Sequence, residues 1–291
     1  MPVGYAAGVR AYQSAAAGLT ARQMTTHYTD GLEWFHEQFI PELKCRIEGL
    51  TGGSWSLKDH VPFAAGSDVD FMAHLIDGVA ASDRVTLFPG DWHGFRVGCS
   101  QTHSIEWDAT GESALACLCV PSVRNGHVTE PMLRFLQNAD ACLLNLNLFP
   151  TLTEADRRSV ATQLQDLLPR SVLSISFSRG FGLTASQLGV ALVPRDHPFC
   201  ERFSRQWNWF TYFYNALAAR AFLEFDLAAA QVVDRARARW VEAWLEERGL
   251  PVVRSGSYYV KSYRVEGELP PHFDALRRDN VIRLCFKPPQ S

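Results

Sequence analysis

The sequence predicts an α/β protein with a mixed, mostly parallel sheet that carries helices on both faces, followed by a smaller α+β unit. Short apolar runs alternate with helical segments through the middle of the chain, which is the pattern of parallel strands joined by helices. A long helical stretch follows the last of these runs. Beyond it the tail reads strand, strand, helix and strand, which is typical of a small α+β domain.

The N-terminal fifty residues are predicted to be helical. Apolar side chains recur at helical spacing over Thr25–Ile47, and Pro41 should kink or divide this helix. A second helix is expected over Phe71–Val79, with Ser67 or Asp68 as its N-cap. These helices precede most of the predicted strands.

Five apolar runs of strand length make up the predicted sheet. They lie at Arg84–Phe88, Ser113–Val120, Ala141–Phe149, Val172–Phe177 and Gly189–Val193. Helices are expected between them over Glu130–Asn138 and over Thr153–Leu168, where Thr153 and Asp156 form a capping pattern. Together these elements predict a large domain over residues 60–205.

The C-terminal third is expected to be helical from Phe210 to Arg248, with one break, and Gly249 should end the helix. Strands follow at Val252–Arg254, Tyr258–Val265 and Val281–Phe286, with one short helix, His272–Arg278, before the last of them. We expect residues 206–291 to form a smaller domain together with residues 1–59. The aromatic cluster Trp207–Tyr214 is predicted to serve in core or interface packing.

Composition narrows the classes of function. The chain has 291 residues, 47% of them hydrophobic, and a net charge of −3, so neither a nucleic-acid footprint nor a membrane-spanning stretch is expected. Its seven cysteines contain no Cys-x-x-Cys pair and predict reduced thiols in a cytoplasmic protein. Histidines and acids lack metal-ligand spacing, so no metal site is predicted. Only four lysines occur, at Lys44, Lys58, Lys261 and Lys287.

The most informative segment is Ser174–Gly189, which reads SISFSRGFGLTASQLG. It resembles the lysine-bearing segment of the fold-type-I pyridoxal-phosphate aminotransferases, Ser-x-Ser-Lys-x-Phe-Gly-Leu-x-Gly-x-Arg-x-Gly. Six positions agree, namely Ser176, Ser178, Phe181, Gly182, Leu183 and Gly189. The resemblance extends over about residues 60 to 290 and implies the aminotransferase fold, whereas function has to be argued from the site.

The positions that carry the family's chemistry differ. Arg179 stands where the family has its Schiff-base lysine, and Gln187 where an arginine grips the cofactor phosphate. Val123 replaces the asparagine that bonds the cofactor hydroxyl, and Asn145 the aspartate that pairs with the pyridine nitrogen. A guanidinium stays protonated and is no nucleophile. We therefore expect no bound cofactor, and no Schiff base in particular.

Other landmarks suggest an anion-binding pocket. Gly66-Ser67-Asp68 resembles the turn that cradles the cofactor phosphate, although a plain N-cap explains it equally well. Trp92 matches the aromatic residue that stacks on the pyridine ring, and surface packing is the alternative. Its neighbour His93 is a candidate for proton transfer. Arg283 matches the arginine that clamps the substrate carboxylate, with a structural salt bridge as the alternative.

Three hypotheses for function follow. The first is a cofactor-independent enzyme, with a role in specialised biosynthesis, that acts on an amino-acid-like or carboxylate substrate. In it Arg179 and His93 are catalytic, and the substrate-binding residues are Trp92, Asn145, Ser176, Gln187 and Arg283. The second is a non-catalytic partner or regulator of an aminotransferase. The third is non-covalent binding of pyridoxal or pyridoxamine phosphate through Ser67, Trp92 and Ser176. In the family this fold forms dimers, so a homodimer is expected.

Overall fold

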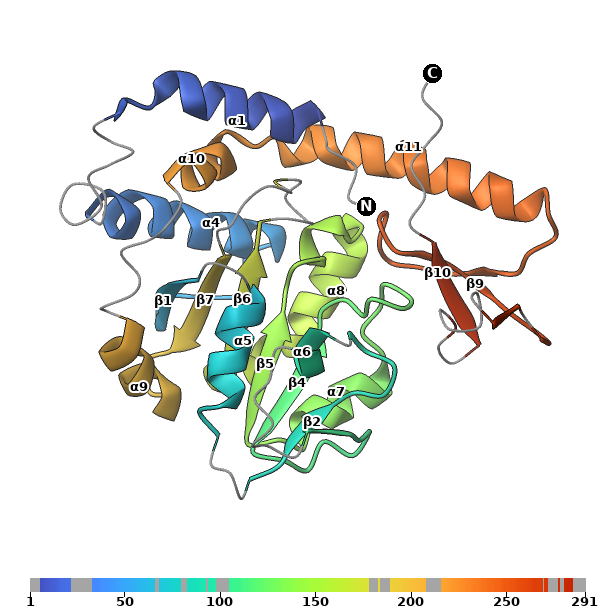
Figure 1. Ribbon diagram of the computed structural model, residues 1–291, viewed down its shortest axis with the longest axis horizontal. Helices are drawn as coiled ribbons and strands as arrows, with labels where there is room; N and C mark the ends of the chain where they lie inside the picture. The colour runs from blue at the N-terminus through green and yellow to red at the C-terminus, as the bar shows by residue number, and fades with distance from the viewer. Residues whose placement is uncertain are drawn as a thin grey trace.

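The computed structural model describes residues 6–21, 33–65, 68–79, 83–92, 94–97, 105–177, 183, 189–207, 216–268, 270–271, 277 and 280–284. In it, one large sheet lies between two layers of helices, and a small sheet lies under the far end of a long C-terminal helix (Figure 1). The predicted α/β class is therefore confirmed.

A seven-stranded sheet forms the centre of the molecule. Its strands are β1 (His60–Ala65), β2 (Val85–Leu87), β3 (Ile105–Trp107), β4 (Leu115–Cys119), β5 (Ala141–Asn145), β6 (Ser171–Ser176) and β7 (Gly189–Pro194). They lie in the order β1-β7-β6-β5-β4-β2-β3, and β7 alone among them runs opposite to the others. The strands β2, β4, β5 and β6 consequently end at one side of the sheet, which we call the carboxyl edge.

All five predicted strands are present, and two edge strands had not been anticipated. β1 contains Pro62, which has no N–H for a ladder and is tolerated because β1 lies at the edge. β3, at the other edge, is partly exposed and lacks an apolar run. The predicted strand Ala141–Phe149 ends at Asn145, because the chain then turns into the 3-10 helix η2 (Phe149–Thr151).

Alternate side chains of the central strands enter two separate apolar cores. Leu143 and Val172 belong to the core under α5 (Asp68–Ile76), α6 (Gly94–Val97) and α9 (Pro198–Trp207). Leu144 and Leu173 belong to the core on the other face. The helices of that second face are α1 (Ala6–Gly18), α4 (Ile40–Leu50), α7 (Glu130–Gln137), α8 (Glu154–Leu164) and α10 (Ala216–Glu224). Near-continuous apolar strands are what two buried faces require.

The N-terminal helices pack across the second face. The π-helix η1 (Phe35–Phe39) runs directly into α4, so the division expected at Pro41 occurs at Ile40, and the proline takes a place in the first turn of α4. Phe39 meets Phe177 and Phe222 edge-on, with ring centroids 5.9 and 5.7 Å apart. This packing joins the N-terminal helices, the sheet and α10 in one core.

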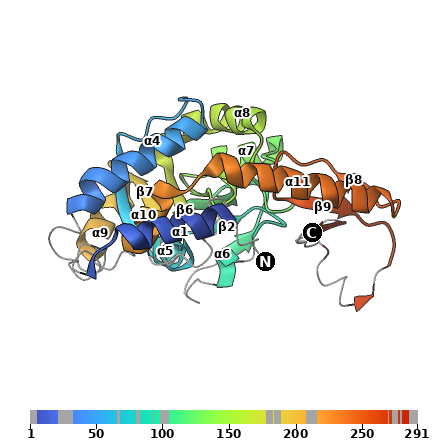
Figure 2. The same ribbon diagram turned by 90° about the horizontal axis from the view of Figure 1, so that it is seen from above.

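The long helix α11 (Leu227–Glu246) carries the small sheet. Its strands β8 (Val252–Val253), β9 (Lys261–Arg264) and β10 (Val281–Leu284) are antiparallel, in the order β10-β9-β8. The break between α10 and α11 confirms the expected interruption. β9 is shorter than the predicted Tyr258–Val265, and most of the predicted helix His272–Arg278 lies outside the described residues. Viewed from above, α1 lies beside α10, and α11 extends from there over the small sheet (Figure 2).

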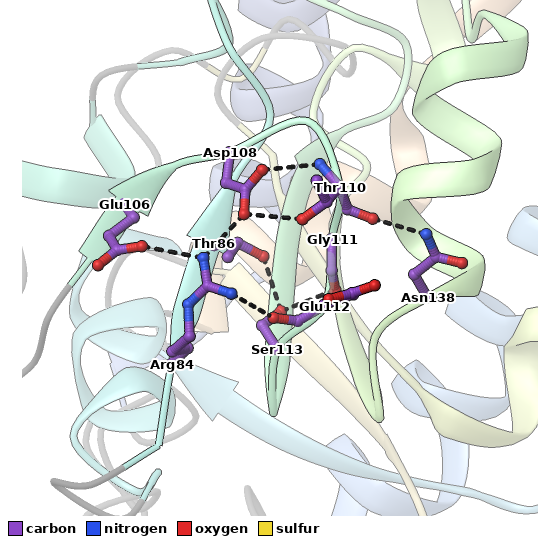
Figure 3. Close-up of polar contacts among 9 residues, drawn as sticks. All are labelled: Arg84, Thr86, Glu106, Asp108, Thr110, Gly111, Glu112, Ser113 and Asn138. Atoms are coloured by element: carbon purple, nitrogen blue, oxygen red, sulfur yellow. Dashed lines mark hydrogen bonds and ion pairs between the residues drawn. The ribbon is translucent and has the colours of Figure 1, made fainter.

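A polar cluster fastens the edge strand β3 to the sheet (Figure 3). Arg84 Nη2 lies 2.9 Å from Glu106 Oε2 and 2.8 Å from Asp108 Oδ2, and Arg84 Nη1 donates to the Glu112 carbonyl. Asp108 also accepts hydrogen bonds from the N–H and hydroxyl of Thr110. We call these residues the Arg84 cluster. Among the described residues, no helix has both the length and the apolar character needed to cross a bilayer.

Candidate functional site

The carboxyl edge gathers several of the predicted site residues. Trp92 lies in the loop after β2, Asn145 ends β5 and Ser176 ends β6. By strand alternation, Asn145 and Ser176 share the face that α5 covers. Asp68 begins α5. Five predicted residues lie outside the part of the chain that the structure describes, namely Gly66, Ser67, His93, Arg179 and Gln187.

Two asparagine side chains join the ends of β5 and β6. The Asn145 Oδ1 atom accepts a hydrogen bond from the Asn147 N–H at 3.0 Å, and the side chain is 3% exposed. The Asn147 Oδ1 atom accepts one from the Ser176 N–H at 2.6 Å. The amide at Asn145 thus holds backbone in place.

The Trp92 ring is held by its neighbours in the loop after β2. It packs edge-on against Phe95, with ring centroids 5.5 Å apart. A Cβ atom on Gly94 would lie only 2.2 Å from the Trp92 ring, so the ring occupies space that a larger residue would take. The indole is half-buried, which suits a stacking surface.

Asp91 is a site residue that the motif comparison did not identify. The turn Phe88–Asp91 closes with a 3.0 Å bond from the Asp91 N–H to the Phe88 carbonyl, and Gly90 has φ +78°. The Asp91 Oδ2 atom accepts the Cys119 N–H of β4 at 2.7 Å. The Oδ1 atom is buried without a hydrogen-bond partner.

Burial raises the pKa of Asp91 to about 6, against the opposing effect of the Cys119 and Trp92 N–H groups and the charge of Arg124. A raised carboxyl pKa in a site loop is typical of functional groups. The sequence signal was the Pro-Gly-Asp turn directly after a strand, which places Asp91 at the carboxyl edge.

Arg283 faces this edge from the small sheet. Its neighbours Ile282 and Leu284 pack on α11, so Arg283 points to the opposite side. Its cross-strand partner Ser262 donates a 2.6 Å hydrogen bond to the Arg124 carbonyl, in the loop after β4. Arg124 Nε in turn donates to the Gly90 carbonyl, beside Asp91. The small sheet is thereby linked to the loop that carries Asp91 and Trp92.

Within the described residues, the Arg283 guanidinium has no hydrogen-bond or ion-pair partner. Its Nε and Nη2 atoms are buried and unpaired, and its one recorded contact is the Tyr259 ring, 5.4 Å from Cζ to the centroid. Tyr259 packs with Val123 and Leu148, the residues after β4 and β5. Arg283 therefore offers a cation to whatever lies at the carboxyl edge.

A second arginine contacts the same ring and, unlike Arg283, has an ion pair and hydrogen bonds of its own, although its Nε makes no hydrogen bond. Arg237 Cζ lies 4.8 Å from the Tyr259 centroid, and Nη2 donates to the Tyr258 and Tyr259 carbonyls at 3.1 and 2.7 Å. Asp234 Oδ1 lies 3.6 Å from Arg237 Nε and balances its charge. Arg237 thus fixes the Tyr258–Tyr259 segment, which leaves the ring in place for Arg283.

The described lysines lie away from this edge. Lys44 donates to the His60 carbonyl at the start of β1, and Lys58 precedes that strand. Lys261 Nζ lies 2.7 Å from Glu242 on α11, and Lys287 is outside the described residues. No described lysine therefore lies at the carboxyl edge. In the same part of the chain, no group of three or more His, Cys, Asp or Glu side chains could hold a metal ion.

Comparison with solved structures identifies the fold. The chain is similar to L,L-diaminopimelate aminotransferase from Chlamydomonas reinhardtii, with a TM-score of 0.71 and 15% identity over 93% of this chain and 75% of that one. It is also similar to an aminotransferase from Staphylococcus aureus, with a TM-score of 0.67 and 12% identity over 94% of this chain and 78% of that one. Histidinol-phosphate aminotransferase from Clostridium acetobutylicum gives a TM-score of 0.63 and 10% identity over 90% of this chain and 80% of that one. No protein-family model and no curated protein matches the sequence. The chain has the fold-type-I aminotransferase fold.

Proposed function

We propose that this chain is an enzyme of aminotransferase fold that binds an amino-acid-like or carboxylate substrate at the carboxyl edge without covalently bound pyridoxal phosphate. The observation that carries the proposal is the Arg283 guanidinium, which faces this edge, has buried Nε and Nη2 atoms in a partly buried residue, and has no described partner. An unpaired buried cation is costly, and a bidentate carboxylate is the ligand that best offsets that cost.

The residues at the carboxyl edge do not suit a covalently held cofactor. In the resemblance Arg179 aligns with the lysine, and among the described residues Lys44 and Lys261 are engaged elsewhere. The Asn145 amide is neutral and its oxygen is taken by the Asn147 N–H, so it would not pair with a protonated pyridine as a carboxylate does. These observations support chemistry by the chain's own groups, with Arg283 binding the carboxylate and Trp92 offering a stacking face.

Direct binding tests this proposal. L-Phenylalanine, L-glutamate and L-alanine are titrated into the protein, with their deamino analogues 3-phenylpropionate, glutarate and propionate, and binding is followed by calorimetry and ligand-observed NMR. We expect at least one carboxylate to bind, and Arg283→Ala to weaken it by about a hundredfold, as expected for a charge-assisted bidentate contact. Arg134→Ala, at an exposed site on α7, is the matched control and should leave affinity unchanged. Equal binding by both variants would refute the role of Arg283.

A second measurement separates the alternatives. Pyridoxal phosphate or pyridoxamine phosphate mixed with the protein should give no shifted absorbance band, whereas a conventional aminotransferase treated identically should. A tight complex would favour non-covalent cofactor binding through Ser67, Trp92 and Ser176. If the protein has no turnover alone yet changes the rate of an added aminotransferase, it is a regulatory partner. Loss of a measured turnover in Arg179→Ala, with the fold intact, would support the enzyme.

A further inference from the structure

Resting on the proposed function, we propose that Asp91 is the specificity-determining residue of this site: its free oxygen accepts a hydrogen bond from the ammonium group of the ligand whose carboxylate Arg283 binds. The site would then select α-amino-acid-like zwitterions over simple carboxylic acids. The proposal stands on the position of Asp91, its burial and its incomplete hydrogen bonding.

The two carboxylate oxygens of Asp91 differ in their hydrogen bonding: Oδ2 has a structural partner and Oδ1 has none. Oδ2 accepts the Cys119 N–H, a donor that is left over because β2 turns away after Leu87. That hydrogen bond explains how the loop after β2 is fastened. Oδ1 is buried without a hydrogen-bond partner in a residue that is 2% exposed, although the Trp92 N–H and the Cys119 thiol also lower the pKa of this carboxyl. The Oδ1 atom of an asparagine at this position could accept the Cys119 N–H without burying a charge. Holding the loop in place therefore does not by itself require an acid.

Asp91 and Arg283 are connected across the site by three hydrogen-bonded segments. Gly90, beside Asp91, accepts from Arg124, whose carbonyl accepts from Ser262, the cross-strand neighbour of Arg283. Trp92 follows Asp91 directly and supplies a face for the body of a ligand. An acid and a cation linked by this chain of hydrogen bonds match the opposite charges of a zwitterion.

Burial makes the free oxygen a strong acceptor. A carboxylate oxygen closed off from water and from protein donors is destabilised in the unliganded protein. A ligand ammonium that reaches it therefore gains more than it would at an exposed acid. We expect the presence of the amino group to raise affinity by about tenfold or more, as charge-assisted hydrogen bonds do.

The test compares matched ligand pairs in matched proteins. The affinity of each amino acid is divided by that of its deamino acid, in wild type, in Asp91→Asn and in the control Asp166→Asn, an exposed acid after α8. We expect a ratio of about ten or more in wild type and Asp166→Asn, and a ratio near one in Asp91→Asn. The deamino acids should bind all three proteins alike, because they report on Arg283 alone.

Each other outcome overturns the proposal at an identifiable step. An unchanged ratio in Asp91→Asn, or a ratio near one in wild type, would remove Asp91 from recognition while leaving carboxylate binding by Arg283 intact. If no carboxylate binds at all, the proposed function fails as well. A purely structural Asp91 would instead weaken both ligands of a pair equally.

A measurement on the wild type covers the case in which Asp91→Asn does not fold. The affinity ratio is followed from about pH 5 to about pH 8, across the region where Asp91 ionises. Arg124 and the Cys119 thiol are the charged and titratable groups recorded around it. The ratio should rise with pH as the carboxyl loses its proton, and a constant ratio would contradict the proposal.

Discussion

The Arg84 cluster and the carboxyl edge contain the same kinds of charged groups, but these groups differ in burial and in the number of their partners. Arg84 is in contact with two carboxylates and a carbonyl, all near the surface. Arg283 is partly buried, its Nε and Nη2 atoms are buried, and it has no described ionic partner. In the cluster, hydrogen bonds from the Thr110 N–H, more than any other cause, hold the pKa of Asp108 below its usual value, whereas burial raises that of Asp91.

This difference separates groups that hold the fold from groups available to a ligand. Charges that serve structure are partnered within the chain, because an unpaired buried charge lowers stability. A fold that nevertheless retains such charges at one edge of its sheet points to a site where function opposes stability. The following predictions test whether that separation holds.

The largest effect is expected from the two arginines at Tyr259. Arg237→Ala should lower the free energy of unfolding by about 3–5 kcal/mol, because it breaks the buried ion pair with Asp234 and removes the donor to the Tyr258 and Tyr259 carbonyls. Arg283→Ala removes a charge that has no partner among the described residues, and it should leave stability nearly unchanged while weakening carboxylate binding by about a hundredfold. Urea unfolding of both variants is the measurement. A comparable loss of stability in Arg283→Ala would show that Arg283, like Arg237, stabilises the fold.

A smaller effect, with a defined dependence on pH, is expected at Asp91. Its pKa is raised from 3.8 to about 6 in the folded state, so the folded protein holds the proton more tightly than the unfolded chain. The destabilisation due to Asp91 is therefore complete above the folded pKa and disappears as pH falls toward the unfolded one. It amounts to about 3 kcal/mol at most.

Asp91→Asn isolates this contribution. Burial lowers the pKa of His197 to about 4 and also lowers that of His60, so both histidines reduce stability as pH falls below their unfolded values. They do so equally in wild type and variant, and their effect cancels in the difference. Urea unfolding at about pH 4.5 and pH 7.5 should show wild type gaining stability relative to Asp91→Asn on acidification. Parallel behaviour of the two proteins would contradict a raised pKa at Asp91.

The sequence was sufficient to predict the central strands and insufficient for the edges. Strands buried on both faces are continuous apolar runs, so β4 and β6 were recognisable from residue type alone. β1 contains a proline and β3 is partly exposed, so neither has such a run. Their pairing depends on neighbours that are distant in the chain.

The resemblance named Trp92, Asn145, Ser176 and Arg283 as substrate-binding residues, and that role stays a prediction. In the structure Trp92 follows β2, Asn145 and Ser176 end β5 and β6, and Arg283 lies in β10 of the small sheet. Asp91 was not named, because its role depends on Cys119, which is 28 residues away. The link from Arg124 to Ser262 spans 138 residues and has no signal in sequence. Burial and missing partners are properties of the folded chain, and no local pattern encodes them.

The smallest effect is expected at Arg84, on the fully partnered side of the comparison. Its guanidinium and the Glu106 carboxylate are exposed, and Asp108 is partly exposed. Ion pairs open to solvent contribute little because water and salt screen them. Arg84→Ala should change the unfolding midpoint only slightly, and high salt should reduce even this difference. Ligand affinity should not change, because the cluster fastens β3 and lies apart from Arg283. A loss of stability as large as that of Arg237→Ala would show that ion pairs at the surface stabilise the fold as strongly as buried ones. Burial would then not explain the difference between the two regions.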